Sequence, residues 1–425
     1  MRGVNCPTGE GKAVAKERSD AEQQVADLLL TAKKSLHLSV AFLTRMDGTT
    51  QHLEVVESSV PFLFKEGVTQ RQDMTLCQAI FDKLLPAVMP NLKDFPFAMT
   101  LPAARLPRIR SYVSVPVVLS DGTVYGTFCA AGLTSDKALT KRDQSLMDVL
   151  AQAASVILEP GIRQRAWRAE LLDRLRPLMA RGGPLVVLQP IVDLATGVRI
   201  GAEALSRFPP AWGKPPDECF AEAHSVGLGD ELELQALAAA AEHLDLVPGY
   251  IAMNISPATL LTPQASDFFD RLPLDRVLLE LSEHEQVADY DVLLAVLAPL
   301  RARGMRLAID DVGAGFSSLR HIVLTAPDVI KLDRSMIDGV STDPVLTTLV
   351  RSLVAFGHDC ASQVVAEGVE TEQDAAALRR LGVDFGQGWH FGRPAPAEDL
   401  MAPTEGAYPL TAVAPERRGS PAAES

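Results

Sequence analysis

The chain has 425 residues, enough for two or three domains, and 47% hydrophobic with 22% charged residues is the usual balance of a globular protein. A net charge of −14 argues against nonspecific binding to nucleic acids or membranes, and no apolar run approaches the roughly 18 residues that span a bilayer. Five scattered cysteines, without CxxC spacing, argue against a complete disulfide framework. These features, with a polar N-terminus that lacks a signal-peptide core, predict a cytoplasmic protein.

The N-terminal part of the chain predicts a small α+β domain. Residues 1–20 are polar and predict a disordered N-terminus. A helical pattern over 21–35 precedes two hairpins, whose turns lie at Asp47–Gly48 and Asp121–Gly122, and helical periodicity returns from Thr140 to about Leu158. Hairpins flanked by helices are typical of one antiparallel sheet with helices packed on it.

Two stretches of this domain indicate its family. They are "TLCQAIF" around Cys77 and "YVSVPVVLSDGTVYGTFCAAG", which is followed by the helical "KRDQSLMDVLAQAASVIL". In these stretches, residues 21–160 resemble the GAF family of small sensory domains. GAF domains bind diverse small molecules or none, so the resemblance implies a sensory role without naming a ligand. Cys77 is compatible with a redox or chromophore site, but a small core residue is the favoured interpretation, since no metal-ligand spacing surrounds it.

A connector is predicted between this domain and the next. Glu159-Pro160-Gly161 predicts a break in the helix, and residues 161–184 are again helical in pattern. Two interpretations stay open: the connector pairs with its copy in a dimer, or its helices pack onto their own domains. At the other end of the chain, residues 401–425 are rich in Pro, Ala and Ser and predict a flexible tail.

From residue 185 onward, apolar strand-like runs alternate with helical stretches. The runs are "LVVLQPIVDL", "RIGAEALSRF", "YIAMNIS", "RVLLELSE", "MRLAIDDV", "DVIKLD", "QVVAEGV" and "VDFGQG". Continuous apolar strands joined by amphipathic helices imply a parallel sheet covered on both faces, and so many units favour a TIM-type barrel. A turn at Thr196–Gly197 joins the first two runs directly, so the barrel is predicted to be modified at its start.

Polar side chains stand at the end of nearly every run. They are Glu203, Asn254, Glu280, Asp310, Asp311, Lys331, Asp333, Glu367 and Gln387. Because a parallel barrel gathers the carboxyl ends of its strands on one face, we expect these side chains to meet there. So many carboxylates would repel one another unless cations lay between them, and oxygen ligands without His or Cys favour Mg²⁺, Mn²⁺ or Ca²⁺ over zinc. A solvated rim and a Lys331–Asp333 ion pair remain alternatives for single residues.

Eight motifs occur in order over residues 185–394: "QPIVDLATG", "EALSRF", "MNIS", "ELSE", "DDVGAGFSSL", "DVIKLDRS", "VVAEGVET" and "QGWHFGRP". Together they resemble the EAL family of cyclic di-GMP phosphodiesterases. The resemblance implies a modified TIM barrel over residues 185–400. It also implies a cytoplasmic enzyme of bacterial signalling that hydrolyses cyclic di-GMP to linear pGpG under the control of the GAF-like domain.

The resemblance further implies roles for individual residues. The implied metal ligands are Glu203, Asn254, Glu280 and Asp310, with Asp311 at the second metal. The implied catalytic residues are Asp311, Lys331, Glu367 and Gln387; the implied substrate-binding residues are Arg207 and Gln189; and the implied loop anchors are Glu283 and Glu370, the last a further active-site carboxylate. The implied cofactors are two Mg²⁺ or Mn²⁺ ions, with Ca²⁺ inhibitory. Two such ions suit the in-line displacement of a phosphodiester.

The loop after Asp311 departs from the family pattern. Val312, Ala314 and Phe316 stand where Phe, Thr and Tyr are typical, although Gly313 and Gly315 are retained. Because a hydroxyl and a phenol are lost, a non-enzymatic cyclic di-GMP receptor is the alternative function, and a different carboxylate-rich barrel enzyme such as a metal-dependent lyase is a third. No GGDEF signature of a synthase is found. A homodimer is expected from the connector and from the family.

Overall fold

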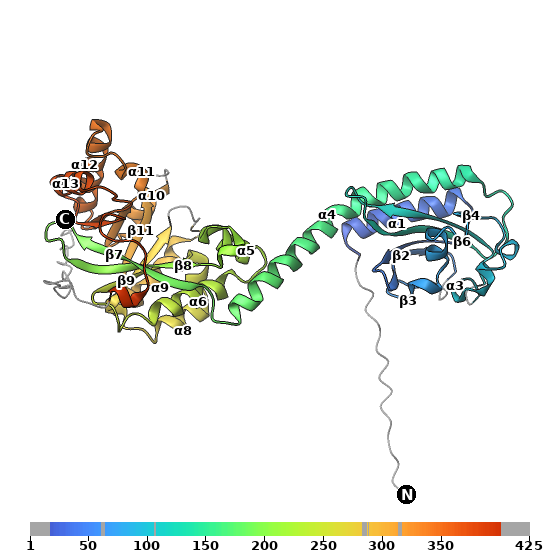
Figure 1. The fold of residues 1–425 in the computed structure, drawn as a ribbon, viewed down its shortest axis with the longest axis horizontal. Helices are drawn as coiled ribbons and strands as arrows, with labels where there is room; N and C mark the ends of the chain where they lie inside the picture. Colours follow the sequence, from blue (N-terminus) through green and yellow to red (C-terminus); the bar gives the residue numbers. More distant parts are fainter. Residues whose placement is uncertain are drawn as a thin grey trace, which may run out of the picture. The chain divides into compact units, whose positions relative to one another are not determined.

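The computed structural model describes residues 18–60, 64–105, 108–282, 287, 289–312 and 317–400. The chain forms two compact units, Met1–Arg168 and Ala169–Ser425 (Figure 1). Several sequence predictions lie outside the described residues: disorder in residues 1–17, the tail 401–425, the anchor Glu283, and the substituted positions Ala314 and Phe316.

The first unit is built on one antiparallel sheet of six strands in the order β3-β2-β1-β6-β5-β4. Its elements are α1 (Asp20–Ser35), β1 (Val40–Met46), β2 (Thr50–Ser58), β3 (Thr69–Arg71), α2 (Leu76–Phe81), β4 (Val88–Met89), α3 (Pro102–Arg105), β5 (Ser111–Val118), β6 (Val124–Gly132) and the start of α4 (Lys141–Met179). Both predicted hairpins are confirmed, as β1–β2 and β5–β6.

Alternate side chains of the central strands pack into two separate hydrophobic cores. Ala41 and Leu43 of β1 belong to a core that includes residues of α1 and α4, whereas Val40 and Phe42 of the same strand belong to a core that includes Cys77 of α2. This alternation is the period of two of a β-strand, in which successive side chains point to opposite faces. The sheet is therefore buried on both faces.

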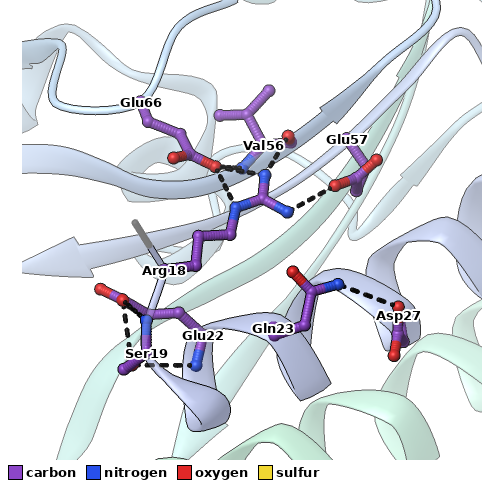
Figure 2. A network of polar contacts seen from close by, with 8 residues as sticks. All are labelled: Arg18, Ser19, Glu22, Gln23, Asp27, Val56, Glu57 and Glu66. Atoms are coloured by element: carbon purple, nitrogen blue, oxygen red, sulfur yellow. Dashed lines mark hydrogen bonds and ion pairs between the residues drawn. The ribbon is translucent and has the colours of Figure 1, made fainter. Parts of the chain in front are cut away.

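The N-terminal helix begins earlier than the sequence predicts. Ser19 caps α1 reciprocally: its side chain accepts a hydrogen bond from the Glu22 amide, and its own amide donates to Glu22 at 2.7 Å. The Arg18 guanidinium donates to Glu57 at 2.8 Å and also contacts Glu66 (Figure 2). The prediction that disorder extends to residue 20 is therefore wrong for residues 18–20, because the capping box and the ion pairs of Arg18 fix them.

The predicted helix break at Glu159-Pro160-Gly161 is also wrong, since α4 runs without interruption through Pro160. Proline removes the hydrogen bond to the carbonyl four residues earlier, here that of Val156. Val156 is 68% exposed, so water can replace the lost donor. Apolar residues of α4 on both sides of Pro160 are buried in the cores of their own units. They are Ala154 and Leu158 before it and Leu171 and Leu175 after it.

Among the described residues, α4 is the helix that is long and apolar enough to cross a membrane by length and composition, a test that core helices of soluble proteins also pass. Met147 and Ala151 in its first half are buried in the core of the first unit. One third of the most apolar window of α4 is buried, so packing accounts for part of this apolar character.

The second unit is a closed barrel of eight strands in the order β10-β11-β12-β13-β14-β7-β8-β9. Its strands are β7 (Leu185–Asp193), β8 (Arg199–Arg207), β9 (Tyr250–Asn254), β10 (Val277–Ser282), β11 (Arg306–Val312), β12 (Val329–Leu332), β13 (Gln363–Ala366) and β14 (Phe385–Gln387). The predicted modification is confirmed, because β7 is antiparallel to both β8 and β14 while the remaining pairs are parallel. The helices are α5 (Pro216–Ser225), α6 (Gly229–Ala241), α7 (Pro257–Leu260), α8 (Pro263–Phe269), α9 (Tyr290–Ala302), α10 (Ser317–Thr325), α11 (Arg334–Ile337), α12 (Pro344–Asp359) and α13 (Glu372–Leu381).

The barrel strands divide their side chains between two cores. The residues that form the smaller core are Ile191, Tyr250, Ala252, Leu278, Ala308, Val329, Val365 and Phe385, one or two from each of seven strands. The intervening residues, such as Ile251 and Leu279, belong to the larger core with residues of the helices. The smaller cluster fills the barrel and supports the layer above it, in which a polar side chain follows two residues after a cluster residue on β9–β14, and Gln189 precedes Ile191 by two on the antiparallel β7.

Candidate active site

The polar strand-end residues predicted from the sequence leave the barrel strands on the face that carries the smaller core. Glu280 follows Leu278 by two residues, and Lys331 follows Val329 in the same way. Because side chains two apart on a strand share a face, each polar group sits one layer above an apolar residue of the barrel interior. A layer of buried apolar side chains in the barrel interior therefore lies directly beneath the polar cluster.

Lys331 occupies the centre of this cluster and is fully buried. Its Nζ lies 2.6 Å from Glu367 Oε1, 2.9 Å from Glu280 Oε1, 3.1 Å from Asp310 Oδ1 and 3.7 Å from Glu203 Oε1. The alternative of a Lys331–Asp333 pair does not describe this geometry, because Asp333 instead caps α11 by accepting from the Ser335 amide at 2.9 Å. Lys331 therefore contacts four acids at the carboxyl ends of four other strands.

Glu203 is oriented by two neutral amides. Asn254 Nδ2 donates to its Oε1 at 3.1 Å, and Gln387 Nε2 donates to its Oε2 at 2.5 Å. Gln387 Nε2 also donates to Gln189 Oε1 at 3.2 Å, and Gln189 Nε2 donates to the Gly392 carbonyl. A chain of amides from β7, β9 and β14 thus fixes a carboxylate that is only 6% exposed.

Asp310 and Asp311 are adjacent in sequence yet both contribute to the site. Oxygens of Asp310, Asp311 and Glu367 lie within 4.8 Å of one another. Neighbouring strand residues normally point to opposite faces, but Asp311 has a left-handed backbone with φ of 57°, and the pairing of β11 with β12 shifts between Ile309 and Val312. An irregularity of this kind re-aims a side chain, and a left-handed non-glycine residue costs about 1–3 kcal/mol.

The cluster carries far more negative than positive charge: the acids Glu203, Glu280, Asp310, Asp311 and Glu367 surround one lysine. Burial raises the pKa of Glu280 well above its ordinary value, and the neighbouring carboxylates raise it further, although Lys331 acts in the opposite direction. Burial and Asp310 raise the pKa of Glu367 well above its ordinary value. Burial lowers the pKa of Lys331, but the surrounding acids outweigh it and leave that pKa well above its ordinary value.

The arrangement fits divalent cations. Oxygens of Glu203, Glu280 and Asp310 lie within 4.8 Å of one another, and Asp310 shares a second group of the same size with Asp311 and Glu367. Both Glu280 oxygens are buried and have no hydrogen-bond donor among the described residues, although Lys331 Nζ lies near one of them. Oxygen-rich sets of this kind are typical of Mg²⁺, Mn²⁺ or Ca²⁺. Asp310 is common to both groups, as expected for a ligand between two ions.

The remaining predicted residues lie at the rim. Arg207 is exposed at the end of β8, where its Nη1 donates to the neighbouring Ser206 carbonyl at 2.9 Å. Glu370 is exposed and pairs with Arg334 at 2.8 Å. The structure therefore leaves Arg207 available to a ligand, whereas Glu370 is not part of the buried cluster.

Sequence reasoning missed one supporting residue, Glu233 of α6. Its carboxylate is 8% exposed, accepts from the Ser256 amide at 2.9 Å and contacts His224 Nε2 at 2.5 Å. Ser256 lies two residues after Asn254, so Glu233 braces the segment that follows this predicted ligand. An acid within the apolar stretch "ELELQALAAAA" was the available signal. A cavity of about 400 Å³, lined by residues of α5, α6 and the strands β7–β9, reaches both Glu233 and Asn254.

Comparison with known families gives two matches. The EAL domain matches residues 172–394, which is more than half of the chain, and the GAF domain matches residues 19–159. The two matched segments fall in the barrel unit and in the first unit, respectively.

Similar curated proteins come from several bacteria. The chain is 34% identical over 305 residues to an uncharacterized signaling protein of Caulobacter vibrioides, covering 68% of this chain and 37% of that protein. It is 32% identical over 251 residues to the bifunctional diguanylate cyclase/cyclic di-GMP phosphodiesterase MucR of Pseudomonas aeruginosa, covering 55% of this chain and 36% of MucR. It is 30% identical over 241 residues to the probable cyclic di-GMP phosphodiesterase PdeB of Escherichia coli, covering 54% and 46%. The chain thus spans less than half the length of these relatives.

Similar solved structures include an EAL phosphodiesterase complex and a larger EAL enzyme. The PaMucR phosphodiesterase in complex with c-di-GMP has 32% sequence identity and a TM-score of 0.50, and the match covers 54% of this chain and 99% of that one. The EAL enzyme Bd1971, bound to cAMP and cyclic di-GMP, has a TM-score of 0.51 over 85% of this chain and 92% of that one; at 20% identity it supports the fold alone.

Proposed function

The chain belongs to the EAL domain family and carries an N-terminal GAF domain, and on this premise we propose that it is a metal-dependent phosphodiesterase that hydrolyses cyclic di-GMP to linear pGpG. The observation that carries the proposal is the cluster of five buried or half-buried acids at the strand ends, four of them close to Lys331, because a phosphodiester substrate is anionic and this cluster calls for cations. The similarity to MucR and PdeB supports the substrate class.

The residues that would hold the ions follow from the two carboxylate groups. Glu203, Glu280 and Asp310, with the amide of Asn254, would bind one ion, and Asp310 with Asp311 would bind the second. Two divalent cations supply an activated water and neutralise the charge of the phosphate during in-line displacement. Mg²⁺ and Mn²⁺ are the proposed ions, and Ca²⁺ is expected to inhibit.

The protein groups have distinct tasks in the proposed reaction. Arg207 binds a non-bridging phosphate oxygen through its planar fork, which holds the substrate over the barrel mouth. Glu367 takes the proton of the attacking water, a role suited to a carboxylate whose pKa is raised. Lys331, 2.6 Å from Glu367, keeps that carboxylate in place and donates to the attacking oxygen. Gln387 and Gln189 keep Glu203 from turning away.

The first unit is the proposed regulator. Helix α4 begins at Lys141 in that unit and ends at Met179 in the barrel unit, so it is a continuous covalent route between them. We further propose a cytoplasmic homodimer, which light scattering at micromolar protein concentration tests: a monomer alone would refute the dimer without touching the hydrolase.

The first experiment is a chromatographic hydrolysis assay with the full chain, cyclic di-GMP, and Mg²⁺ or Mn²⁺ against an EDTA control. Metal-dependent appearance of pGpG is expected, and Glu203→Ala should abolish it. Glu242→Ala is the matched control, since Glu242 is exposed at the end of α6 that leads to the amino end of β9. Tight binding of cyclic di-GMP without turnover would instead support a receptor, the alternative that the departures at Ala314 and Phe316 raise. Failure to bind it would overturn both functions.

A further inference from the structure

Two cysteines in the first unit face each other across its core. Cys77 lies on α2 and Cys129 on β6, 52 residues apart in sequence, and their sulfur atoms are 3.5 Å apart. Both thiols are free, and their residues are 3% and 0% exposed. Among the described cysteines, this is the pair whose thiols are in contact. The interpretation of Cys77 as an ordinary small core residue leaves this contact unexplained.

The surroundings of the pair are unusually polar for a core. The Tyr112 hydroxyl lies 3.0 Å from Cys77 Sγ, the Ser114 hydroxyl 3.3 Å from Cys129 Sγ, and the Thr127 hydroxyl 3.1 Å from Cys129 Sγ. Thr127 in turn contacts the Thr44 hydroxyl at 2.7 Å. A purely structural core position needs no such shell, whereas a thiolate buried away from water needs donors around it.

The pKa values of the two thiols are shifted in opposite directions by their surroundings. Burial raises the pKa of Cys77, but hydrogen bonds from Cys129, Thr127, Tyr112 and Gln51 outweigh it and bring the pKa to about 6. Burial and the neighbouring Cys77 raise the pKa of Cys129 well above its ordinary value. Cys77, which lies in the first turn of α2 and is the less deeply buried of the two residues, is therefore the nucleophile of the pair, and Cys129 is the thiol that retains its proton.

We propose that Cys77 and Cys129 are a redox-active dithiol that a hydroperoxide converts to a disulfide. The Cys77 thiolate attacks the peroxide, an O–O bond breaks, and Cys77 becomes a sulfenic acid while hydroxide leaves. Cys129 sulfur then attacks the Cys77 sulfur, an S–S bond forms, and water leaves with the Cys129 proton. Overall two thiols are oxidised and one hydrogen peroxide is reduced to two waters.

The geometry favours this reaction over its competitors. A disulfide has an S–S length of about 2.05 Å, so the sulfurs must approach by about 1.5 Å, and Cys77 lies on a helix of only six residues. Because both thiols are buried, the oxidant must be small and uncharged, which excludes glutathione disulfide. The resolving thiol is already in contact, so the sulfenic acid is consumed before further oxidation. The first unit would then respond to oxidants.

The test is peptide mass spectrometry of the full chain after hydrogen peroxide treatment, digested without reductant. The expected product is a Cys77–Cys129 linked peptide, two hydrogens lighter than the reduced pair and reversed by dithiothreitol, with no linkage after glutathione disulfide. Cys77 left reduced at a dose that oxidises the partly exposed Cys360 would overturn the proposal. So would sulfinic or sulfonic Cys77 without a link to Cys129.

Two variants separate the roles of the thiols. Cys129→Ser should prevent the disulfide and leave Cys77 as a sulfenic acid, which dimedone labels when the peroxide-treated protein is unfolded in denaturant that contains dimedone, whereas Cys219→Ser, a buried cysteine of α5, should behave as wild type. Circular dichroism verifies that each variant is folded. If Cys129→Ser fails to fold, the wild-type mass measurement decides by itself. If Cys129→Ser is folded before peroxide treatment, absence of this dimedone labelling after unfolding would refute Cys77 as the nucleophile.

Discussion

Replacement of Glu280 by glutamine distinguishes a metal ligand from a structural ion pair, because the two roles predict opposite results without metal. Glu280 is 0% exposed, lies 2.9 Å from Lys331 and has no hydrogen-bond donor on either oxygen among the described residues. If it served only to neutralise Lys331, the change would break a buried pair and cost about 3–5 kcal/mol. If Glu280 is instead a metal ligand, the three other acids suffice to neutralise Lys331 and Glu280 contributes little without a cation, so we expect a change below about 1 kcal/mol in the metal-free protein, or a gain.

The pH dependence of stability is a second test of the state of Glu280 in the metal-free protein. Burial, with a contribution from neighbouring acids, raises the pKa of Glu280 well above its ordinary value, so the folded metal-free protein keeps a proton that the unfolded chain has released. The contribution of Glu280 to stability therefore falls as pH rises from the ordinary pKa of glutamate towards the raised one. Glu280→Gln cannot titrate, and the difference in stability between pH 5 and pH 8 in EDTA should shrink.

Added metal should make the wild type more stable than Glu280→Gln. A cation at 100 times its dissociation constant stabilises the wild type by about 2.7 kcal/mol, which is a Tm increase of about 5–11 °C for a unit of this size. Loss of a charged ligand that weakens binding about 100-fold leaves about 0.4 kcal/mol, or roughly 1 °C.

Thermal unfolding followed by tryptophan fluorescence measures both effects, since Trp212 and Trp389 lie in the barrel unit. Glu242→Gln is the charge-matched control and should retain the wild-type response to Mg²⁺. A loss of about 3 kcal/mol or more in EDTA, together with an unchanged response to Mg²⁺, would refute the ligand role and leave Glu280 as a structural partner of Lys331.

The other predictions concern the rim, the brace and the dithiol. Arg207→Ala should raise the KM for cyclic di-GMP by about tenfold or more while leaving the Mg²⁺-induced Tm shift unchanged; a lowered Tm shift would place Arg207 in the metal site instead. Glu233→Ala removes the acceptor of the Ser256 amide and should raise the metal concentration needed for half-maximal activity by about tenfold, with kcat at saturating metal retained; an unaltered metal titration would show that Glu233 does not position Asn254. The rate of Cys77 oxidation by hydrogen peroxide should rise about tenfold per pH unit below its pKa of about 6 and level off above it, because the thiolate reacts and the lowered pKa keeps it ionised; a rate still rising at pH 8 would contradict the perturbed thiol.

Much of the barrel could be read from local pattern. Each apolar run became a strand, and the polar residue at its end was placed on the expected face because side chains two apart share a face. Thr196–Gly197 also indicated that the barrel is modified at its start, since the short connection between β7 and β8 cannot hold a crossover helix. These inferences need only the geometry of one strand and one connection.

Other features depended on contacts that local pattern does not record. Pro160 predicts a break, but burial on both sides of it keeps α4 continuous. Local spacing paired Lys331 with Asp333, whereas barrel closure gives it four acids from other strands. The Cys77–Cys129 contact joins residues 52 apart, and nothing near either cysteine indicates the other.

The sequence by itself therefore determined which side chains leave each strand end, because strand periodicity is a property of a few neighbouring residues. Only the tertiary structure decided which of them meet. Asp311 is the clearest case: strand alternation would turn it away from Asp310, and a left-handed backbone within an irregular β11–β12 pairing brings both carboxylates to one site. Such a conformation is locally unfavourable, so it persists only where the surrounding barrel fixes it.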